Sequence, residues 1–170
     1  MTRFDELAAA RRTHKAFGAE PVPRETLLEL FELARLAPNH HLTQPWRFRV
    51  LGPETLARLK EAAGQSEALK LDRAPTLVLA SAALSGELLQ DEEDVCATAA
   101  AITLILLGAT ERGLASYWRT PGVLRTARGR EAVGVPDGER VLGLIHLGPP
   151  EREPAPRERG AVADYVEFLP

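Results

Sequence analysis

Apolar residues recur at helical spacing in three segments near the N-terminus. Thr2 and Asp5 have the spacing of a capping box, and the apolar stripe behind them predicts a helix that ends near residue 11. Pro23 suits a first helical position, and the apolar residues after it predict a second helix that ends before Pro38. Residues 53–64 begin with proline and end with glycine, and their apolar spacing predicts a third helix.

Four other segments have the patterns of strands. In residues 46–50 apolar side chains alternate with arginines, which is the period of a strand with one face in the core. Residues 76–81 form a continuous apolar run, which favours a central strand buried on both faces. Residues 114–118 and 141–147 indicate two further short strands. The mixture of helices and strands predicts an α+β fold.

The longest apolar segment has the signals of a helix at both ends. Acidic residues 91–94 precede it, and it ends at Gly113, so that negative charge and glycine lie where a helix favours each. Its uncharged part, residues 95–109, is shorter than the roughly 20 residues that cross a bilayer. We therefore expect the buried central helix of a domain, and no membrane partner.

Length, charge and cysteine content agree with one compact domain that comprises residues 1–170. The net charge of −3 provides no general attraction for nucleic acid, so we expect no nucleic-acid partner. The single cysteine, Cys96, cannot form an intramolecular disulfide, and the N-terminus lacks the apolar core of a signal peptide. These features predict a cytoplasmic protein.

The last 20 residues differ in pattern from the rest of the chain. Residues 151–160 are charged and contain prolines, which predicts an extended arm; a merely solvated linker is the alternative. Five apolar residues follow: Val162, Tyr165, Val166, Phe168 and Leu169. An apolar end beyond a polar arm needs a surface to dock on, so we expect residues 151–170 to pack on a partner subunit.

The first candidate site is the basic run at the end of the first predicted helix. Arg11, Arg12 and Lys15 offer positive charge, and Thr13 offers a hydroxyl, in a combination that suits phosphate oxygens. The alternative is a solvated helix C-terminus, where cations interact favourably with the helix dipole.

The second candidate site is the polar loop 37–46, between a predicted helix and a predicted strand. His40 and Gln44 can exchange hydrogen bonds with hydroxyl groups and with the polar edge of a heterocycle. A turn with surface histidines is the alternative. A zinc site has little support, because His40 and His41 are adjacent and the cysteine is solitary. We therefore expect no metal.

The third candidate site follows the predicted strand 114–118. Trp118, Arg119 and Thr120 place an aromatic ring, a cation and a hydroxyl where loops often carry ligand contacts, although Trp118 can equally belong to the core. The chain contains no GxGxxG, Walker A, GxSxG or HExxH motif. Dinucleotide-fold, P-loop, serine-hydrolase and zinc-protease functions therefore lack support.

Taken in order, these segments resemble the flavin-dependent nitroreductase family, in particular its minimal single-domain bacterial members. The resemblance is carried by residues 10–17, 23–25, 34–38, 44–48, 113–119 and 148–150. It implies an α+β sandwich in which helices flank a mostly antiparallel sheet. It also implies an intertwined homodimer with one FMN in each of two interface pockets.

The resemblance assigns roles at the phosphate end of the cofactor. Arg11, Arg12 and Thr13 are expected to hold the FMN phosphate or ribityl chain. Arg157 and Arg159 resemble a basic pair near the C-terminus of the family that joins the phosphate site.

Other residues are implied to surround the flavin ring. Lys15 is expected at the pyrimidine edge, where a cation favours reduction of the ring. His40 and Gln44 resemble contacts that reach the flavin from the partner subunit. The stretch that closes around the cofactor in minimal members is matched by Trp118, Arg119 and Thr120.

The implied activity is hydride transfer from NADH or NADPH to flavin and then to a small acceptor, such as a nitroaromatic or quinone-like compound. No side chain is expected to act as a nucleophile or general base, because the cofactor carries the chemistry. A flavin-binding regulatory or storage protein shares this site and is the alternative. The chain departs from many members at Leu42, where they have asparagine, and it lacks the insertion that covers the substrate in larger relatives.

Overall fold

The computed structural model describes residues 2–170. In chain order its elements are α1 (Arg3–Ala10), α2 (Arg24–Ala34), the 3-10 helix η1 (His40–Leu42), β1 (Trp46–Val50), α3 (Pro53–Ala62), α4 (Gln65–Leu71), β2 (Thr76–Ala83), α5 (Leu88–Glu111), β3 (Ala115–Arg119), the 3-10 helix η2 (Gly122–Arg125), α6 (Ala127–Ala132), β4 (Glu139–Gly148) and the 3-10 helix η3 (Val162–Asp164).

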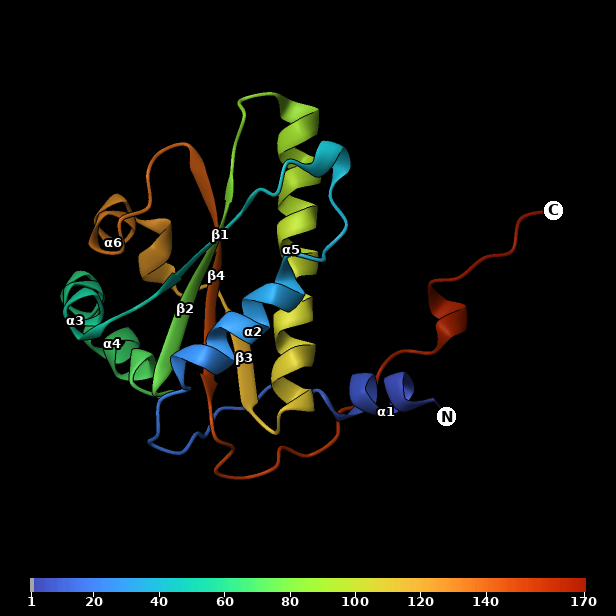
Figure 1. The fold of residues 1–170 in the computed structure, drawn as a ribbon, viewed down its shortest axis with the longest axis horizontal. Helices are drawn as coiled ribbons and strands as arrows, with labels where there is room; N and C mark the ends of the chain where they lie inside the picture. Colours follow the sequence, from blue (N-terminus) through green and yellow to red (C-terminus); the bar gives the residue numbers. More distant parts are fainter. Residues whose placement is uncertain (1) are drawn as a thin grey trace.

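The four strands form one antiparallel sheet in the order β1-β2-β4-β3 (Figure 1). Trp46 lies opposite Ala82, and Ser116 lies opposite Leu147, which fixes the register of the two edge strands. Seven of the eight residues of β2 are buried, so the prediction of a central strand is confirmed. β4 begins two residues earlier than its apolar pattern, because Glu139 and Arg140 continue the ladder.

Helices cover both faces of the sheet, as expected for an α+β sandwich. α2 and α5 lie on one face, and α3, α4 and α6 lie on the other (Figure 1). Ile102, Ile105 and Ile145 belong to the core under α5, whereas Leu59 and Leu144 belong to the core under α3 and α4. The alternation of side chains along each strand divides the two cores.

The central helix is confirmed, although it is longer than its apolar segment. α5 begins at Leu88, so the acidic residues 91–94 occupy its first two turns. By length and composition α5 could cross a membrane, a test that core helices also pass; half of its most apolar 18-residue window is buried. Two short helices, α4 and α6, were not predicted from the sequence, because seven and six residues are too few to display a helical period.

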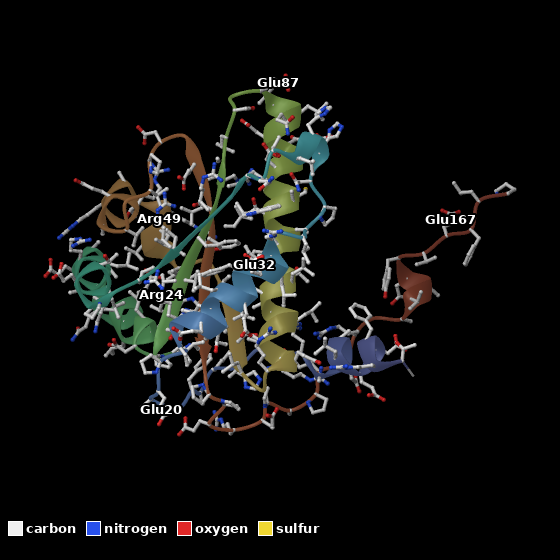
Figure 2. The ribbon with its side chains drawn as sticks, in the orientation of Figure 1. Glu20, Arg24, Glu32, Arg49, Glu87 and Glu167 are labelled. Atoms are coloured by element: carbon white, nitrogen blue, oxygen red, sulfur yellow. The ribbon has the colours of Figure 1, made fainter. Side chains whose placement is uncertain are left out.

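The two ends of the chain stand apart from the sandwich. None of the residues of α1 is buried, although its predicted capping box between Thr2 and Asp5 is present. Residues 151–160 contain no helix or strand, as predicted for an extended arm. The segment that follows, which includes Glu167, extends away from the sheet beyond α5 (Figure 2), and Phe168 is 94% exposed.

Candidate functional site

A groove of about 950 Å³ lies between residues 11–16 and residues 152–159. The start of the arm is fixed beside the turn, because Phe17 bridges Pro150 and the Gly18 N–H donates to the Pro149 carbonyl over 2.9 Å. The fold therefore brings the first basic cluster and the C-terminal arm together.

The basic turn is held on the free edge of β3. Thr13 forms a parallel bridge with Ser116, and the His14 N–H donates to the Ser116 carbonyl over 3.0 Å. His14 is buried, whereas Thr13 and Lys15 on either side of it are exposed. This alternation presents the threonine hydroxyl and the lysine ammonium to solvent.

Positive charge dominates the groove. It is lined by six cationic side chains, Arg11, Arg12, Lys15, Arg152, Arg157 and Arg159, and by two carboxylates, Glu153 and Glu158. Between residues 2 and 170, none of these six cations lies within 4.0 Å of a carboxylate oxygen. Arg12 donates to the Ala9 and Arg11 carbonyls and Arg159 to the Glu158 carbonyl, so the charges of these groups are not neutralised. Cations without carboxylate partners suit a ligand with a phosphate group.

A second cavity of about 280 Å³ lies along α5 and shares two residues with the groove. Arg11 and Thr13 line it together with Thr103 and Leu106 of α5 and Trp118 of β3. The structure therefore places Trp118 in the same cavity lining as Arg11 and Thr13. Its expected contact with the cofactor stays a prediction.

Hydrogen bonds to one carbonyl fix the end of β3. The Trp118 indole N–H and the Thr120 hydroxyl both donate to the Leu142 carbonyl, over 3.0 and 2.9 Å. Gly143 allows this approach, since a Cβ there would lie 2.5 Å from the Arg119 carbonyl oxygen, and its φ of 142° favours glycine.

Arg119 lies on the opposite face of β3 from Trp118. It donates to Glu67 of α4 over 3.4 Å, and the same carboxylate accepts the N–H groups of Gly122 and Val123. Within one chain, Arg119 is therefore separated from Arg11 and Thr13 by the sheet itself. Its expected contact with the cofactor stays a prediction.

A buried histidine lies on the face of the sheet that Arg119 occupies. It is His146 of β4, which pairs with Tyr117 of β3. His146 is fully buried, and its ring lies 5.6 Å from that of Tyr117. Both of its ring nitrogens lack hydrogen-bond partners among the described residues. Burial, with a smaller effect of Arg119 and Arg73, lowers the pKa of His146 to about 4. His146 is therefore neutral near pH 7 and takes no part in the groove.

The loop that contains His40 and Gln44 is tied to the first turns of α5. His40 lies 2.7 Å from the Glu93 carboxylate, and the Thr43 hydroxyl donates to Asp94 over 2.5 Å. His41, Leu42 and Gln44 have φ values of 52°, 53° and 46°. Three non-glycine residues out of four therefore have a left-handed backbone conformation, which stores strain. Such strain is frequent in ligand-binding loops.

One chain does not bring the two halves of the predicted site together. The loop contacts α5 at Glu93, and the basic turn meets it at Leu106. At 1.5 Å per residue these positions are about 20 Å apart. Figure 1 shows η1 and α1 toward opposite ends of α5. Gln44 instead lines a separate cavity of about 580 Å³ with Asn39 and Leu42.

Sequence reasoning missed several residues that line the site. Thr103 faces the second cavity from α5, and Ser116 anchors the basic turn. Both belong to regular elements whose pattern reports only burial, so their sequence carried no signal. Arg152 could have been included, because it lies in the same charged arm as Arg157 and Arg159. In residues 2–170, no three or more His, Cys, Asp or Glu side chains are grouped as a metal site requires.

The sequence pattern described as "Nitroreductase family" matches residues 8–70 and 65–149. The chain is 27% identical to "Putative NAD(P)H nitroreductase YfhC" of Bacillus subtilis, with 94% of this chain and 90% of the relative covered. A nitroreductase-like family protein from Bacillus cereus superposes with a TM-score of 0.90 at 23% identity, over 99% and 97% of the two chains.

A second solved structure, a mutant of the FMN and NADPH-dependent nitroreductase NfnB of Sphigopyxis sp. strain HMH, has a TM-score of 0.83 at 18% identity and covers 99% of this chain and 100% of its own. The family pattern spans most of the sequence, and the fold superposes on the similar structures over nearly the whole chain. The chain therefore belongs to the nitroreductase family.

Proposed function

We propose that this chain binds FMN as a homodimer and transfers hydride from NADH or NADPH to a small acceptor, such as a nitroaromatic or quinone-like compound. The observation that carries the proposal is the groove, where cations of residues 11–16 and 152–159 converge without carboxylate partners among residues 2–170. Family membership supports the class of reaction, and the FMN dependence of the Sphigopyxis enzyme supports the choice of cofactor.

The donor set of the groove fits the phosphate end of FMN. Arg11, Arg12 and Thr13 supply two guanidinium groups and a hydroxyl, and Arg157 and Arg159 supply two more guanidinium groups from the facing arm. Such groups form charge-assisted hydrogen bonds with phosphate oxygens. Lys15 adds an ammonium charge at the exposed side of the turn, where a cation favours reduction of a neighbouring flavin ring.

The ring end of the site requires a second copy of the chain. His40 and Gln44 lie about 20 Å along α5 from the basic turn of their own chain, by the rise of an α-helix. A two-fold axis that pairs the α5 helices in opposite directions would bring the loop of one copy to the turn of the other. Trp118 and Thr120, at the end of β3, would complete the wall of this shared pocket.

Exposed apolar surface supports such a dimer. Leu88 and Leu89 in the first turn of α5 are 83% and 66% exposed, and Leu36 and Leu42, which line the cavity with Gln44, are 67% and 75% exposed. The C-terminal segment is likewise exposed, with Tyr165 at 71% and Leu169 at 79%. Many exposed large apolar side chains typically mark an interface, and a second copy would cover these residues.

Bound FMN would accept hydride from NAD(P)H and pass two electrons to the acceptor. Overall, NAD(P)H, a proton and the acceptor give NAD(P)⁺ and the two-electron-reduced acceptor; a nitro group gives a nitroso group and water. The side chains of this protein contribute placement and charge. Arg11 and Arg12 would hold the cofactor by its phosphate, and the Trp118 ring would form an apolar part of the adjoining cavity wall.

The absorption spectrum of the purified protein, measured together with its mass in solution, tests the cofactor and the assembly. We expect the bands of bound oxidised flavin and a mass twice the 18.5 kDa of one chain. A colourless 18.5 kDa protein that does not bind added FMN would contradict the proposal.

Anaerobic mixing with NADH or NADPH tests turnover separately. We expect the flavin bands to bleach with one or both nucleotides and to return when an acceptor is added. If the protein stays yellow with both nucleotides at saturating concentrations, it binds flavin without reductase activity, as a storage or regulatory protein would.

A further inference from the structure

A cavity of about 530 Å³ lies beside Trp118, where β4 extends past the end of β3. β3 pairs with β4 from Leu144 to Gly148, and residues 139–143 of β4 continue beyond it. The volume is within the range of small-molecule sites.

The inner wall of this cavity is apolar. It is formed by Val95 and Ala99 of α5, Leu124 of η2, and Val141 and Leu142 of β4. The polar atom of the Trp118 indole is satisfied by the Leu142 carbonyl, which leaves the ring as a further apolar surface. Such a wall suits a planar aromatic group.

Three arginines line the cavity from three different elements: Arg125 of η2, Arg130 of α6 and Arg140 of β4. Across residues 2–170, none of their guanidinium groups lies within 4.0 Å of a carboxylate oxygen. Arg125 and Arg140 are exposed and Arg130 is half-buried, so all three guanidinium groups are accessible to an anion in the cavity.

The acidic residue of the cavity lining is already engaged. Glu139 accepts two hydrogen bonds from Arg49 at 2.8 Å and one from Ser81 at 2.6 Å. The Arg49 guanidinium holds the pKa of Glu139 below its ordinary value, so its charge is matched by Arg49. Arg125, Arg130 and Arg140 are left to meet a negative charge from outside the chain.

We propose that this cavity binds an aromatic acceptor that has a carboxylate group, with the three arginines around the carboxylate and the ring against the apolar wall. The inference rests on the proposed function, because Trp118 also lines the cavity that contains Arg11 and Thr13, so this acceptor is held next to the candidate cofactor site. A phosphate of NADPH is another source of negative charge, but the aromatic wall favours a carboxylate on a ring.

Equilibrium binding tests the subsite without turnover. 3-Nitrobenzoate and 3-nitrobenzamide differ in charge but little in shape, and each is titrated into the FMN-loaded dimer without reductant, with the flavin spectrum and tryptophan fluorescence as readouts. We expect the carboxylate to bind about tenfold more tightly than the amide. Equal affinities would overturn the proposal, and this holds even if the protein reduces neither compound.

Substitutions of the three arginines test whether these side chains recognise the carboxylate of the acceptor. We expect R125Q, R130Q and R140Q each to lower the preference for the carboxylate several-fold, in both the dissociation constants and the ratio of kcat/KM values, and the triple variant to abolish it. R128Q is the matched control, because Arg128 is exposed on α6 next to Arg130 and does not line the cavity. An equal loss in R128Q would mean that only the general field of the protein attracts anions.

The arginine variants also distinguish the two candidate anions, which are the carboxylate of the acceptor and a phosphate of NADPH. The KM for NADPH relative to NADH is measured with a neutral acceptor for the unmodified protein and for R140Q. A ratio unaffected by the substitution supports the acceptor site, whereas a selective rise for NADPH with no change for 3-nitrobenzoate would assign the arginines to the nucleotide and overturn the proposal. Loss of the proposed function itself would instead appear as failure of NADH and NADPH to bleach the flavin.

Discussion

The two ends of α5 carry the two halves of the candidate cofactor site, and they are built by different means. Near its C-terminal end, the groove gathers cations from segments far apart in sequence, and backbone bridges fix them on β3 and beside Pro149. Near its N-terminal end, the loop of His40 and Gln44 is tied down by Glu93 and Asp94 and contains strained backbone.

Only one of these two halves depends on a second copy of the chain. The groove is assembled within one chain and acts through charge, so it needs no partner to attract a phosphate. The loop presents polar side chains and exposed Leu42 at a distance from the groove, so its contribution depends on how two chains pair.

Separating the subunits has the largest expected effect, because it removes the loop from the groove altogether. Cys96 is exposed on α5, and in the proposed pairing of the α5 helices this exposed side chain would meet the partner subunit. We expect C96R to give a monomer whose affinity for FMN falls by a factor on the order of 1,000, about 4 kcal/mol.

Sedimentation gives the mass of this variant, and a flavin titration gives its affinity. A57R, which introduces the same charge at an exposed residue of α3, should stay dimeric and yellow. A monomeric C96R that still binds FMN as tightly as the unmodified chain would show that the groove suffices alone.

Acid should lower the stability of the fold as a whole through His146. Its pKa is about 4 in the folded chain and 6.5 ordinarily, so the unfolded chain binds the proton more tightly. The free energy of unfolding should thus be highest above pH 6.5 and fall by up to about 3 kcal/mol as the pH approaches 4, with no further loss from this residue below that value.

Urea unfolding at a series of pH values measures how the free energy of unfolding depends on pH. In H146L this dependence should be weaker between pH 6.5 and 4. Glu139, whose pKa is lowered by Arg49, loses its stabilising charge only below its ordinary value of 4.5, so it leaves the upper part of the window unaffected. A slope that persists in H146L would mean that another group titrates there.

Removing single cations from the groove should have an intermediate effect. We expect R11Q and R159Q each to weaken FMN binding about tenfold, or about 1.4 kcal/mol, because each removes a charge-assisted hydrogen bond to phosphate. The loss should shrink at high salt. Titration of the flavin-free protein measures it, with R24Q as the control, since Arg24 is exposed on α2 away from the groove. If R159Q binds FMN normally, the arm is a solvated linker.

Changing the loop should have the smallest effect and should distinguish strain from contact. Gln44 has a φ of 46°, which glycine adopts freely. We expect Q44G to raise the free energy of unfolding by up to about 1 kcal/mol and to weaken FMN binding a few-fold. Q44A should weaken binding equally without the gain in stability. Unchanged binding in both variants would remove Gln44 from the site.

Prediction from sequence succeeded where a local pattern had a single structural cause. The alternation in residues 46–50 and the unbroken apolar run in β2 follow from burial of one or both faces of a strand, and both strands were found. It failed for α4 and α6, and it placed Arg119 beside Trp118 without separating their faces. Neighbouring residues of a strand point to opposite sides, so adjacency in sequence does not mean a shared pocket.

The α+β composition, the central apolar helix and the basic segments could be read from residue types and short-range spacing, because each of these features depends on local sequence. The tertiary structure alone decided that the arm meets the turn of residues 11–16, that His40 faces Glu93, and that the two halves of the site lie at opposite ends of α5. These are consequences of packing helices on both faces of a twisted sheet, and no local spacing encodes the distance between segments that the fold brings together or keeps apart.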